Sequence, residues 1–590
     1  MVDQRIYRAG FVATLLTVLV VMFSLQERPA PLGTPIAPDA FQGEIAYGDT
    51  ARLVKLFPDR VPGGAGDEAL GSFVEGRFRA LGLETSRDRF TGQHDGQDVG
   101  MSNVIGLLNA PSDRQVVVMA PRDAEGRPGA SSASSTATLL QLAQALDGSS
   151  RQKTFVFVSL DGSAAGNAGA ERFARSYPDR DKVDAVLAID EPGAASARRP
   201  FVLPWSSSAR RASLQVLRTA ETALARESGE ASRSDSWTAQ FLRQAWPLTL
   251  REQGPLVARG LDAVTITSRG ELPHGDGTDG LAGISSERLQ NFGRAAFSAA
   301  LAYDAARDIQ RSPDRYIVAG RKVLPGWAIA LLAVGLVTPA MIASFDAFAR
   351  SRRRRILGSP SVRWIAGGVA PFALILGVAL LFELLGWLPD SASEALAPAT
   401  RPGTAAAAAP LLALLVAFAC GCVFLRPRLT GRLGGIGLAG PGPAVAIALL
   451  LAIEVLLVCA TDPFTALMLV PAAHLAVVAA LPEPPRRGAM AGGFIVCALA
   501  LPVLAIAYYG GHLRLGGDLI GYALLLVESA TGSVWTATLV SIVAGTLVSA
   551  AIASLARARL EEADEPVTVR GPVTYAGPGS LGGTESALRR

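Results

Sequence analysis

Three short apolar runs in the first half of this 590-residue chain are each followed by an aspartate. The runs with their aspartates are Val116–Met119 with Asp123, Phe155–Val158 with Asp161, and Val186–Ile189 with Asp190. If the runs are strands of a parallel sheet, the carboxylates lie at the edge where ligands of such sheets bind. Carboxylates at close range can bind zinc, which accepts oxygen and nitrogen donors. The carboxyl ends of these strands are therefore the candidate site.

Segments with helical spacing alternate with the apolar runs. Ser134–Leu146 lies between the first two runs, and Ala168–Arg175 follows the second. The other predicted helices are Glu68–Leu81, Ala209–Arg226 and Ser285–Ile309, and the other strands are near Thr85–Phe90, in Asn103–Leu108 and within Val257–Ile266. Together these elements predict an α/β domain with a mostly parallel central sheet and helices on both faces.

Five segments of this half resemble known motifs, and they occur in the matching order. They are Ala120–Asp123, Gly129–Thr136, Asp161–Ala170, Asp190–Gly193 and Leu272–Asp279. In this order they resemble the zinc aminopeptidases of metallopeptidase family 28, which also includes glutaminyl-cyclase-like proteins. The resemblance covers roughly residues 45–310 and implies the same α/β fold.

The resemblance implies a two-zinc site, but most ligand positions of that site are substituted. The substituted positions are Pro121 for a histidine, Ser132 for the metal-bridging aspartate, and Ser163 and Ala164 for a glutamate pair. The resemblance retains Asp123, Asp190 and His274, of which Asp123 only supports a ligand and the other two bind different metals. One carboxylate and one imidazole cannot form a catalytic zinc site. We therefore expect no metal cofactor and no peptidase activity.

The composition is that of a membrane protein. Half of the residues are apolar, only 18% are charged, and the formal net charge is +4. The apolar residues concentrate in residues 323–556, and the basic residues gather in short loops. This arrangement indicates membrane topology and excludes nucleic-acid binding. The abundance of Arg, Ala and Gly favours a bacterial source.

Eight segments are apolar enough to cross a membrane. They are Ala9–Leu25 and about 324–345, 364–388, 405–425, 443–461, 463–481, 489–509 and 533–556. Asp518–Glu528 is too short to span and is interpreted as interfacial. The predicted units are an anchor (1–27), a Pro-rich tether (28–44), the peptidase-like domain (45–312), a seven-span bundle (323–556) and a disordered cytoplasmic tail (557–590).

Arginines set the predicted orientation. Arg5 and Arg8 precede the first span, and Arg350 with Arg352–Arg355 follows the second. Basic loops remain in the cytoplasm, so we expect a multi-pass protein of the cell membrane with its large domain outside the cytoplasm. One span, a peptidase-like domain and seven further spans resemble the architecture of the membrane subunit of the GPI transamidase.

Charged or polar residues inside predicted spans are candidates for function. Glu454 is the most deeply placed, and Glu383, Asp462 and His474 are the others. The four cysteines all lie in apolar segments of the second half, so no disulfide is expected in the large domain.

Three functions are consistent with the sequence. The first is a non-catalytic scaffold or substrate-binding subunit, whose partner is another membrane protein or an exported peptide or lipid-linked substrate, in contact with membrane lipids. The second is an active membrane-bound zinc aminopeptidase whose site is rebuilt from other residues, namely Asp123, Glu125, Asp190, Glu191, His274 and Asp276. The third is a transporter or lipid-handling protein with an accessory exported domain.

Overall fold

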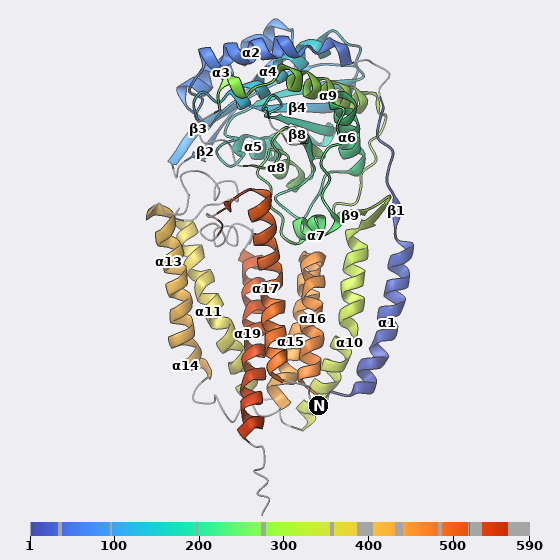
Figure 1. Ribbon diagram of the computed structural model, residues 1–590, viewed down its shortest axis with the longest axis vertical. Coiled ribbons are helices and arrows are strands. Elements are labelled where there is room, and N and C mark those ends of the chain that lie inside the picture. Colours follow the sequence, from blue (N-terminus) through green and yellow to red (C-terminus); the bar gives the residue numbers. More distant parts are fainter. Residues whose placement is uncertain are drawn as a thin grey trace, which may run out of the picture.

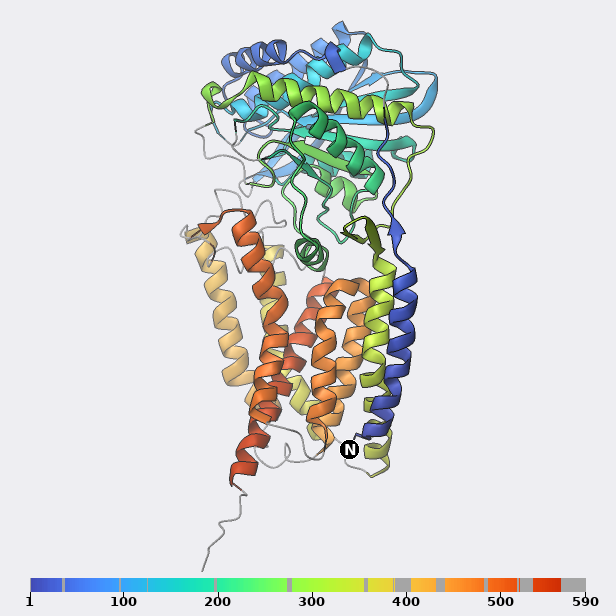
Figure 2. The same cartoon turned by 45° about the vertical axis from the view of Figure 1, so that its right-hand side comes forward.

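A large α/β domain sits on one end of a bundle of long helices in the computed structural model (Figures 1 and 2). The structure describes residues 2–33, 38–94, 97–124, 126–195, 199–272, 279–354, 359–385, 387, 405–430, 441–481, 487–516, 519 and 534–563. His274, Glu125 and Asp276 lie outside these ranges, as do most of Asp518–Glu528 and most of the predicted tail.

A seven-stranded sheet forms the centre of the large domain, with the strand order β2-β3-β5-β4-β6-β8-β7. The central strands are β5 (Lys153–Leu160), β4 (Ser112–Pro121), β6 (Val183–Asp190) and β8 (Ala263–Thr267), and they run parallel. The outer strands β2 (Glu84–His94), β3 (Gln97–Leu108) and β7 (Phe201–Leu203) pair antiparallel. The predicted α/β fold is confirmed, and the antiparallel outer strands make the sheet mixed.

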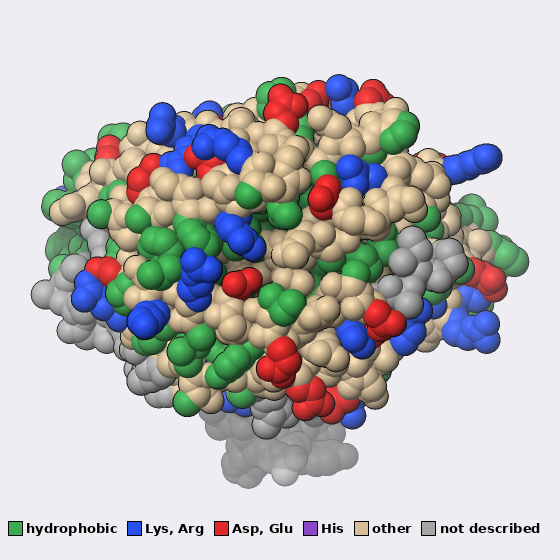
Figure 3. Space-filling view, turned by 90° about the horizontal axis from the view of Figure 1, so that it is seen from above, with side chains coloured by type: hydrophobic (Ala, Val, Ile, Leu, Met, Phe, Trp, Pro, Cys, Tyr) green, Lys and Arg blue, Asp and Glu red, His purple; other side chains and the backbone are tan. Residues whose placement is uncertain are grey.

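Helices cover both faces of this sheet, which explains why its central strands are continuously apolar and buried. On the face away from the bundle lie α2 (Gly43–Leu56), α3 (Ala65–Ala80), α4 (Ala130–Asp147) and α9 (Ser286–Ala305), seen in Figure 1. On the other face α5 (Ala168–Ser176) packs against α8 (Gln253–Ala258). The outermost surface carries acidic and basic side chains interspersed, as expected for contact with water (Figure 3).

Several predicted boundaries need correction. The last parallel strand, Ala263–Thr267, lies where it was predicted within Val257–Ile266 and extends one residue beyond, while Val257 itself belongs to helix α8. The helix predicted from Ala209 is α6 (Leu214–Ser228), and α9 ends at Ala305. The sequence analysis did not predict the start of α2 in the tether or the small sheet formed by β1, β9 and β10. Helix α2 begins at Gly43, and β1 (Gln26–Glu27) pairs with β10 (Lys322–Pro325), which forms a hairpin with β9 (Tyr316–Ala319).

The bundle contains seven described helices that are long and apolar enough to cross a membrane. They are α1 (Gln4–Phe23), α10 (Gly326–Arg353), α11 (Ser359–Leu384), α13 (Ala405–Cys420) with its continuation to Thr430, α15 (Pro441–Thr461), α17 (Arg487–His512) and α19 (Val534–Ala563). Large apolar side chains are exposed on its outside, including Phe23 and Leu384 at 83%. Such helices with apolar outer surfaces are typical of a multi-pass membrane protein.

The segment predicted to span over 463–481 is shorter than the others. Helix α16 (Pro463–Ala479) has 17 residues, which gives about 26 Å at about 1.5 Å per residue, less than the ~30 Å apolar layer. Asp462 begins this helix by accepting hydrogen bonds from the backbone N–H groups of Phe464 and Thr465. Helix capping therefore explains the presence of Asp462, one of the predicted intramembrane charges, without a functional role.

Candidate functional site

The fold brings together the described positions of the predicted site. Pro121 ends β4 and Asp190 ends β6, while Ser163 and Ala164 lie in the turn after β5. Ser132, in the first turn of α4, donates a hydrogen bond to the backbone oxygen of Asp123. The motif positions therefore meet at the carboxyl edge of the parallel strands, as the sequence predicted.

Asp123 holds the turn that follows β5. Its buried carboxylate accepts hydrogen bonds from the N–H groups of Ser163, at 3.0 Å, and Ala164, at 2.8 Å. Burial and then the neighbouring carboxylate of Asp161 raise the pKa of Asp123, while the two N–H groups oppose this rise. A carboxylate that already accepts these bonds supports the backbone of the site.

Arg251 neutralises Asp190, the carboxylate for which the resemblance implies a metal-binding role. Its Nη1 lies 2.6 Å from Oδ2 of Asp190, and both side chains are 1% exposed. Its Nε and Nη2 donate to the carbonyl oxygens of Gly270 and Leu272, at 2.9 and 2.8 Å. Burial opposes this charge, but Asp190 and then Glu191 raise the pKa of Arg251 above its usual value. A permanently charged guanidinium thus supplies the positive charge that a metal ion would otherwise supply at this carboxylate.

Glu191 completes the charged cluster around Arg251. Its carboxylate oxygens lie 3.4 Å from Nη2 of Arg251 and 3.6 Å from Nη1 of Arg269. Its backbone has a φ of 47°, which is uncommon for a residue with a side chain. Ser135 accepts its N–H at 2.8 Å, and Ser268 donates to its carbonyl oxygen at 2.6 Å. This residue was considered as a ligand of a rebuilt metal site, and it lies instead between two arginines.

The side chains that the structure describes at the strand ends do not by themselves form a zinc-binding set. Among the described residues, no three His, Cys, Asp or Glu side chains are grouped so that they could hold a metal ion. Pro121 and Ala164 offer no side-chain donor, and Arg251 places a cation against Asp190. A hydrolytic zinc site needs three protein ligands and an open position for water.

A second buried arginine, Arg122, forms an ion pair with Asp161. Arg122 is fully buried, and its Nη2 lies 2.6 Å from Asp67 and 3.1 Å from Asp161. Asp161 also accepts a hydrogen bond from the N–H of Ser102 at 2.8 Å. No sequence pattern indicates this cluster, because Asp67 lies 55 positions before Arg122 and only the fold brings the two residues together.

A third buried ionic cluster joins the large domain to the bundle. Arg243, in α7 (Trp237–Ala245), pairs with Glu271, and both side chains are 1% exposed. His512, at the end of α17, lies 2.7 Å from Nη2 of Arg243 and 3.1 Å from Glu271. Tyr508 accepts from Nε of Arg243 at 2.9 Å. Burial opposes ionisation of Glu271, but Arg243 and His512 outweigh it and lower the pKa of Glu271.

One segment runs from this interface to the strand ends. Trp246 accepts a hydrogen bond from Tyr509 of α17 at 2.6 Å, and Leu248 and Leu250 pack in the same apolar cluster as Tyr509. The next residue is Arg251, which pairs with Asp190. The strand-end site is therefore connected to the bundle through only a few residues of continuous chain.

The polar residues inside the bundle have structural contacts. Glu454 is buried and accepts a hydrogen bond from Thr546 of α19 at 2.7 Å. His474 lies between Tyr7, at 2.7 Å, and the carbonyl oxygen of Leu336, at 2.8 Å, so it joins three helices. The side chain of Glu383 lies outside the described part. A functional role for Glu454 stays a prediction.

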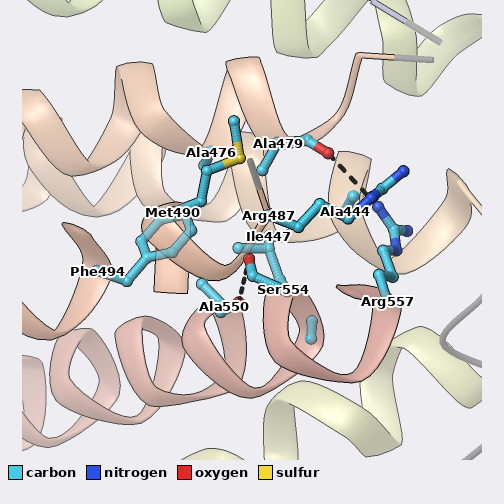
Figure 4. Close-up of a pocket in the computed structure, with 11 residues that line it drawn as sticks. Ala444, Ile447, Ala476, Ala479, Arg487, Met490, Phe494, Ala550, Ser554 and Arg557 are labelled. Atoms are coloured by element: carbon cyan, nitrogen blue, oxygen red, sulfur yellow. Dashed lines mark hydrogen bonds between the residues drawn. The ribbon is translucent and has the colours of Figure 1, made fainter. Parts of the chain in front are cut away.

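A small pocket lies at the end of the bundle far from the large domain (Figure 4). Its volume is about 20 Å³, enough for about one water molecule. Arg487 and Arg557 line it together with apolar residues, and Arg557 donates to the carbonyl oxygen of Ala479 at 3.5 Å. A space of this size gives no support to a transported solute.

Residues 103–249 match the model of peptidase family M28, which confirms the resemblance predicted from the motifs over this range. Similar solved structures include a zinc aminopeptidase from Bacillus subtilis, with 15% identity, a TM-score of 0.38, and 46% of this chain and 99% of that chain covered. A glutaminyl cyclase from Porphyromonas gingivalis has 19% identity, a TM-score of 0.35 and coverage of 44% and 98%. Among curated protein sequences, none matches this chain. The architectural resemblance to the GPI transamidase subunit stays a prediction.

Proposed function

We propose that this protein is a membrane-anchored, non-catalytic relative of the M28 peptidases that acts as a scaffold or substrate-binding subunit. The observation that supports this function is the ion pair of Arg251 with Asp190 at 2.6 Å, both buried. Zinc hydrolases of this design need ligands and a general base that Ser132, Ser163 and Ala164 cannot provide. An active site rebuilt around Asp190 and Glu191 would first have to break their pairing with Arg251.

The position of the strand ends supports a membrane-linked partner. Glu271 follows β8 closely and contacts His512 of α17, so the strand-end edge lies near the bundle. A molecule that reaches this edge would be near the membrane surface. This favours another membrane protein, or an exported peptide or lipid-linked molecule, over a freely diffusing substrate.

We predict that the large domain lies outside the cytoplasm of a bacterial cell. Arg350, Arg352 and Arg353 lie in the last turn of α10 and Arg354 caps it, at the end of the bundle away from the large domain, near the N-terminus (Figure 1). Basic residues gather on the cytoplasmic side of membrane proteins. A reporter fused at Gly229, an exposed residue that ends α6, should be active only outside, and a reporter at the C-terminus only inside. Cytoplasmic activity at Gly229 would contradict the proposed orientation.

A scaffold without chemistry of its own requires a partner. We expect the tagged full-length protein, purified in mild detergent, to retain a second protein in a constant ratio that an unrelated tagged multi-pass protein does not retain. Repeated isolation of a lone monomer would contradict the scaffold function, while leaving the strand-end geometry unchanged.

A further inference from the structure

A cavity of about 380 Å³ lies beyond the edge strand β7, on the side of the large domain next to the bundle. Its lining comes from β7, α6, α7 and β9, together with Arg28 and His512. Arg28 follows the first membrane helix, β9 leads through β10 into α10, and His512 ends α17. The cavity therefore lies where these three helices meet the large domain, at the level of β9 and α7 in Figure 1.

Arginine dominates the charged lining of this cavity. The charged residues are Arg28, Arg211, Arg218, Arg233 and Arg243 against Glu221 and Asp235. This leaves an excess of three positive charges in the lining, of which the one on Arg243 is already paired with Glu271 outside the lining. Burial and then the charges of Arg218 and Arg211, only partly opposed by Glu221, lower the pKa of Arg28. Like charges at this range repel each other, so an anion in the cavity would be stabilised.

Two of these arginines are fixed in place and retain unused donors. Arg211 stacks on Trp205 and Tyr316, with its guanidinium carbon 4.2 and 4.5 Å from the ring centres. Arg243 has a side chain that is 1% exposed. Within the described part of the chain, Nε of Arg211 and Nη1 of Arg243 are buried without a hydrogen-bond partner. A buried donor without an acceptor is costly, so a ligand oxygen there would add binding free energy.

We propose that this cavity binds a phosphate group, carried by a lipid head group or by a soluble phosphate compound. Guanidinium groups match the geometry of phosphate oxygens and bind them through paired hydrogen bonds. The volume lies in the usual range for small-molecule sites. Trp237 lines the cavity and is 65% exposed, as tryptophans at a membrane surface often are. None of the lining residues belongs to the strand-end positions, so this site is independent of the non-catalytic function proposed above.

The test is a titration of the detergent-solubilised full-length protein with a fluorescent short-chain phosphatidic acid. Arg233→Gln removes an exposed arginine of the lining and is expected to weaken binding about tenfold, the value of one charge-assisted hydrogen bond. Arg321→Gln is the matched control, since it removes the same charge from an exposed position in the β9–β10 turn outside the lining. Its affinity should equal that of the unchanged protein.

Competition with inorganic phosphate identifies the source of the group. Displacement of the lipid at a phosphate concentration near the lipid's own Kd would indicate a soluble phosphate compound. Displacement only at far higher concentration would indicate a lipid head group, and both results support a phosphate site. Absence of saturable binding of either probe would overturn the proposal. An equal loss of lipid affinity in Arg233→Gln and Arg321→Gln would also overturn it, because it would indicate general electrostatic attraction to the protein surface.

Discussion

Replacing Arg251 by methionine is expected to lower the free energy of unfolding of the large domain by about 3–5 kcal/mol. The substitution leaves the buried carboxylate of Asp190 without its cation and removes the bonds to the carbonyl oxygens of Gly270 and Leu272. A buried charge that loses its partner costs far more than the pair itself contributes. The change in the free energy of unfolding is measured by titrating the full-length protein in detergent with denaturant and using the susceptibility of the large domain to proteolysis as the signal of its unfolding.

Two further variants identify the cause of that loss. Arg79→Met breaks an exposed pair with Glu75 and should change stability by less than about 1 kcal/mol. Adding Asp190→Asn to Arg251→Met should recover part of the loss, because the buried carboxylate closest to the missing guanidinium is then neutral. If Arg251→Met does not fold, Arg251→Lys, which retains the charge but not the forked geometry, gives an intermediate value. A cost for Arg251→Met no larger than that for Arg79→Met would contradict the role of the ion pair.

Restoring the four substituted ligand positions is expected to leave the protein without stoichiometric zinc. The variant carries Pro121→His, Ser132→Asp, Ser163→Glu and Ala164→Glu. Arg251 still holds its charge at Asp190, and a unit charge about 4 Å away costs a cation about 4 kcal/mol at an effective dielectric constant of about 20. This cost lowers the affinity for the ion about a thousandfold for each unit of its positive charge.

Removing the competing charge should reverse this result. Adding Arg251→Gln to the four substitutions frees Asp190 from its ion pair. We expect the variant with all five substitutions to bind zinc, which is measured by elemental analysis of the protein after dialysis. The matched control is Arg269→Gln in the same background, because Arg269 lies near Glu191 but does not pair with Asp190. Equal zinc binding with and without Arg251→Gln would show that the arginine does not exclude the metal.

The central fold could be predicted because its signal is local. Strands β4, β5 and β6 each contain a run of buried apolar residues, and each is followed by a polar turn. Motif order then placed Ser132, Ser163 and Asp123 at one edge, where the structure has them. The last parallel strand could be predicted only as lying within Val257–Ile266, because a short apolar run has no period that separates a strand from a buried helix, and α8 occupies the start of that range.

The charged clusters could not be predicted, because their partners are distant in the sequence. Arg251 precedes a short helix and carries no pattern that indicates Asp190 as its partner. Glu271 and His512 are 241 positions apart and belong to the domain and the bundle respectively. The motifs indicate which zinc-ligand positions of the resemblance are substituted, whereas only the packing shows that Arg251 lies against Asp190.

The most direct measurement of the central claim is the zinc content of the purified full-length protein, together with an assay on aminoacyl substrates. The non-catalytic function predicts zinc far below one ion per chain and no hydrolysis above the rate of an Arg251→Gln variant. Stoichiometric zinc that a chelator removes with loss of hydrolysis, and that returns with activity on adding zinc back, would contradict it.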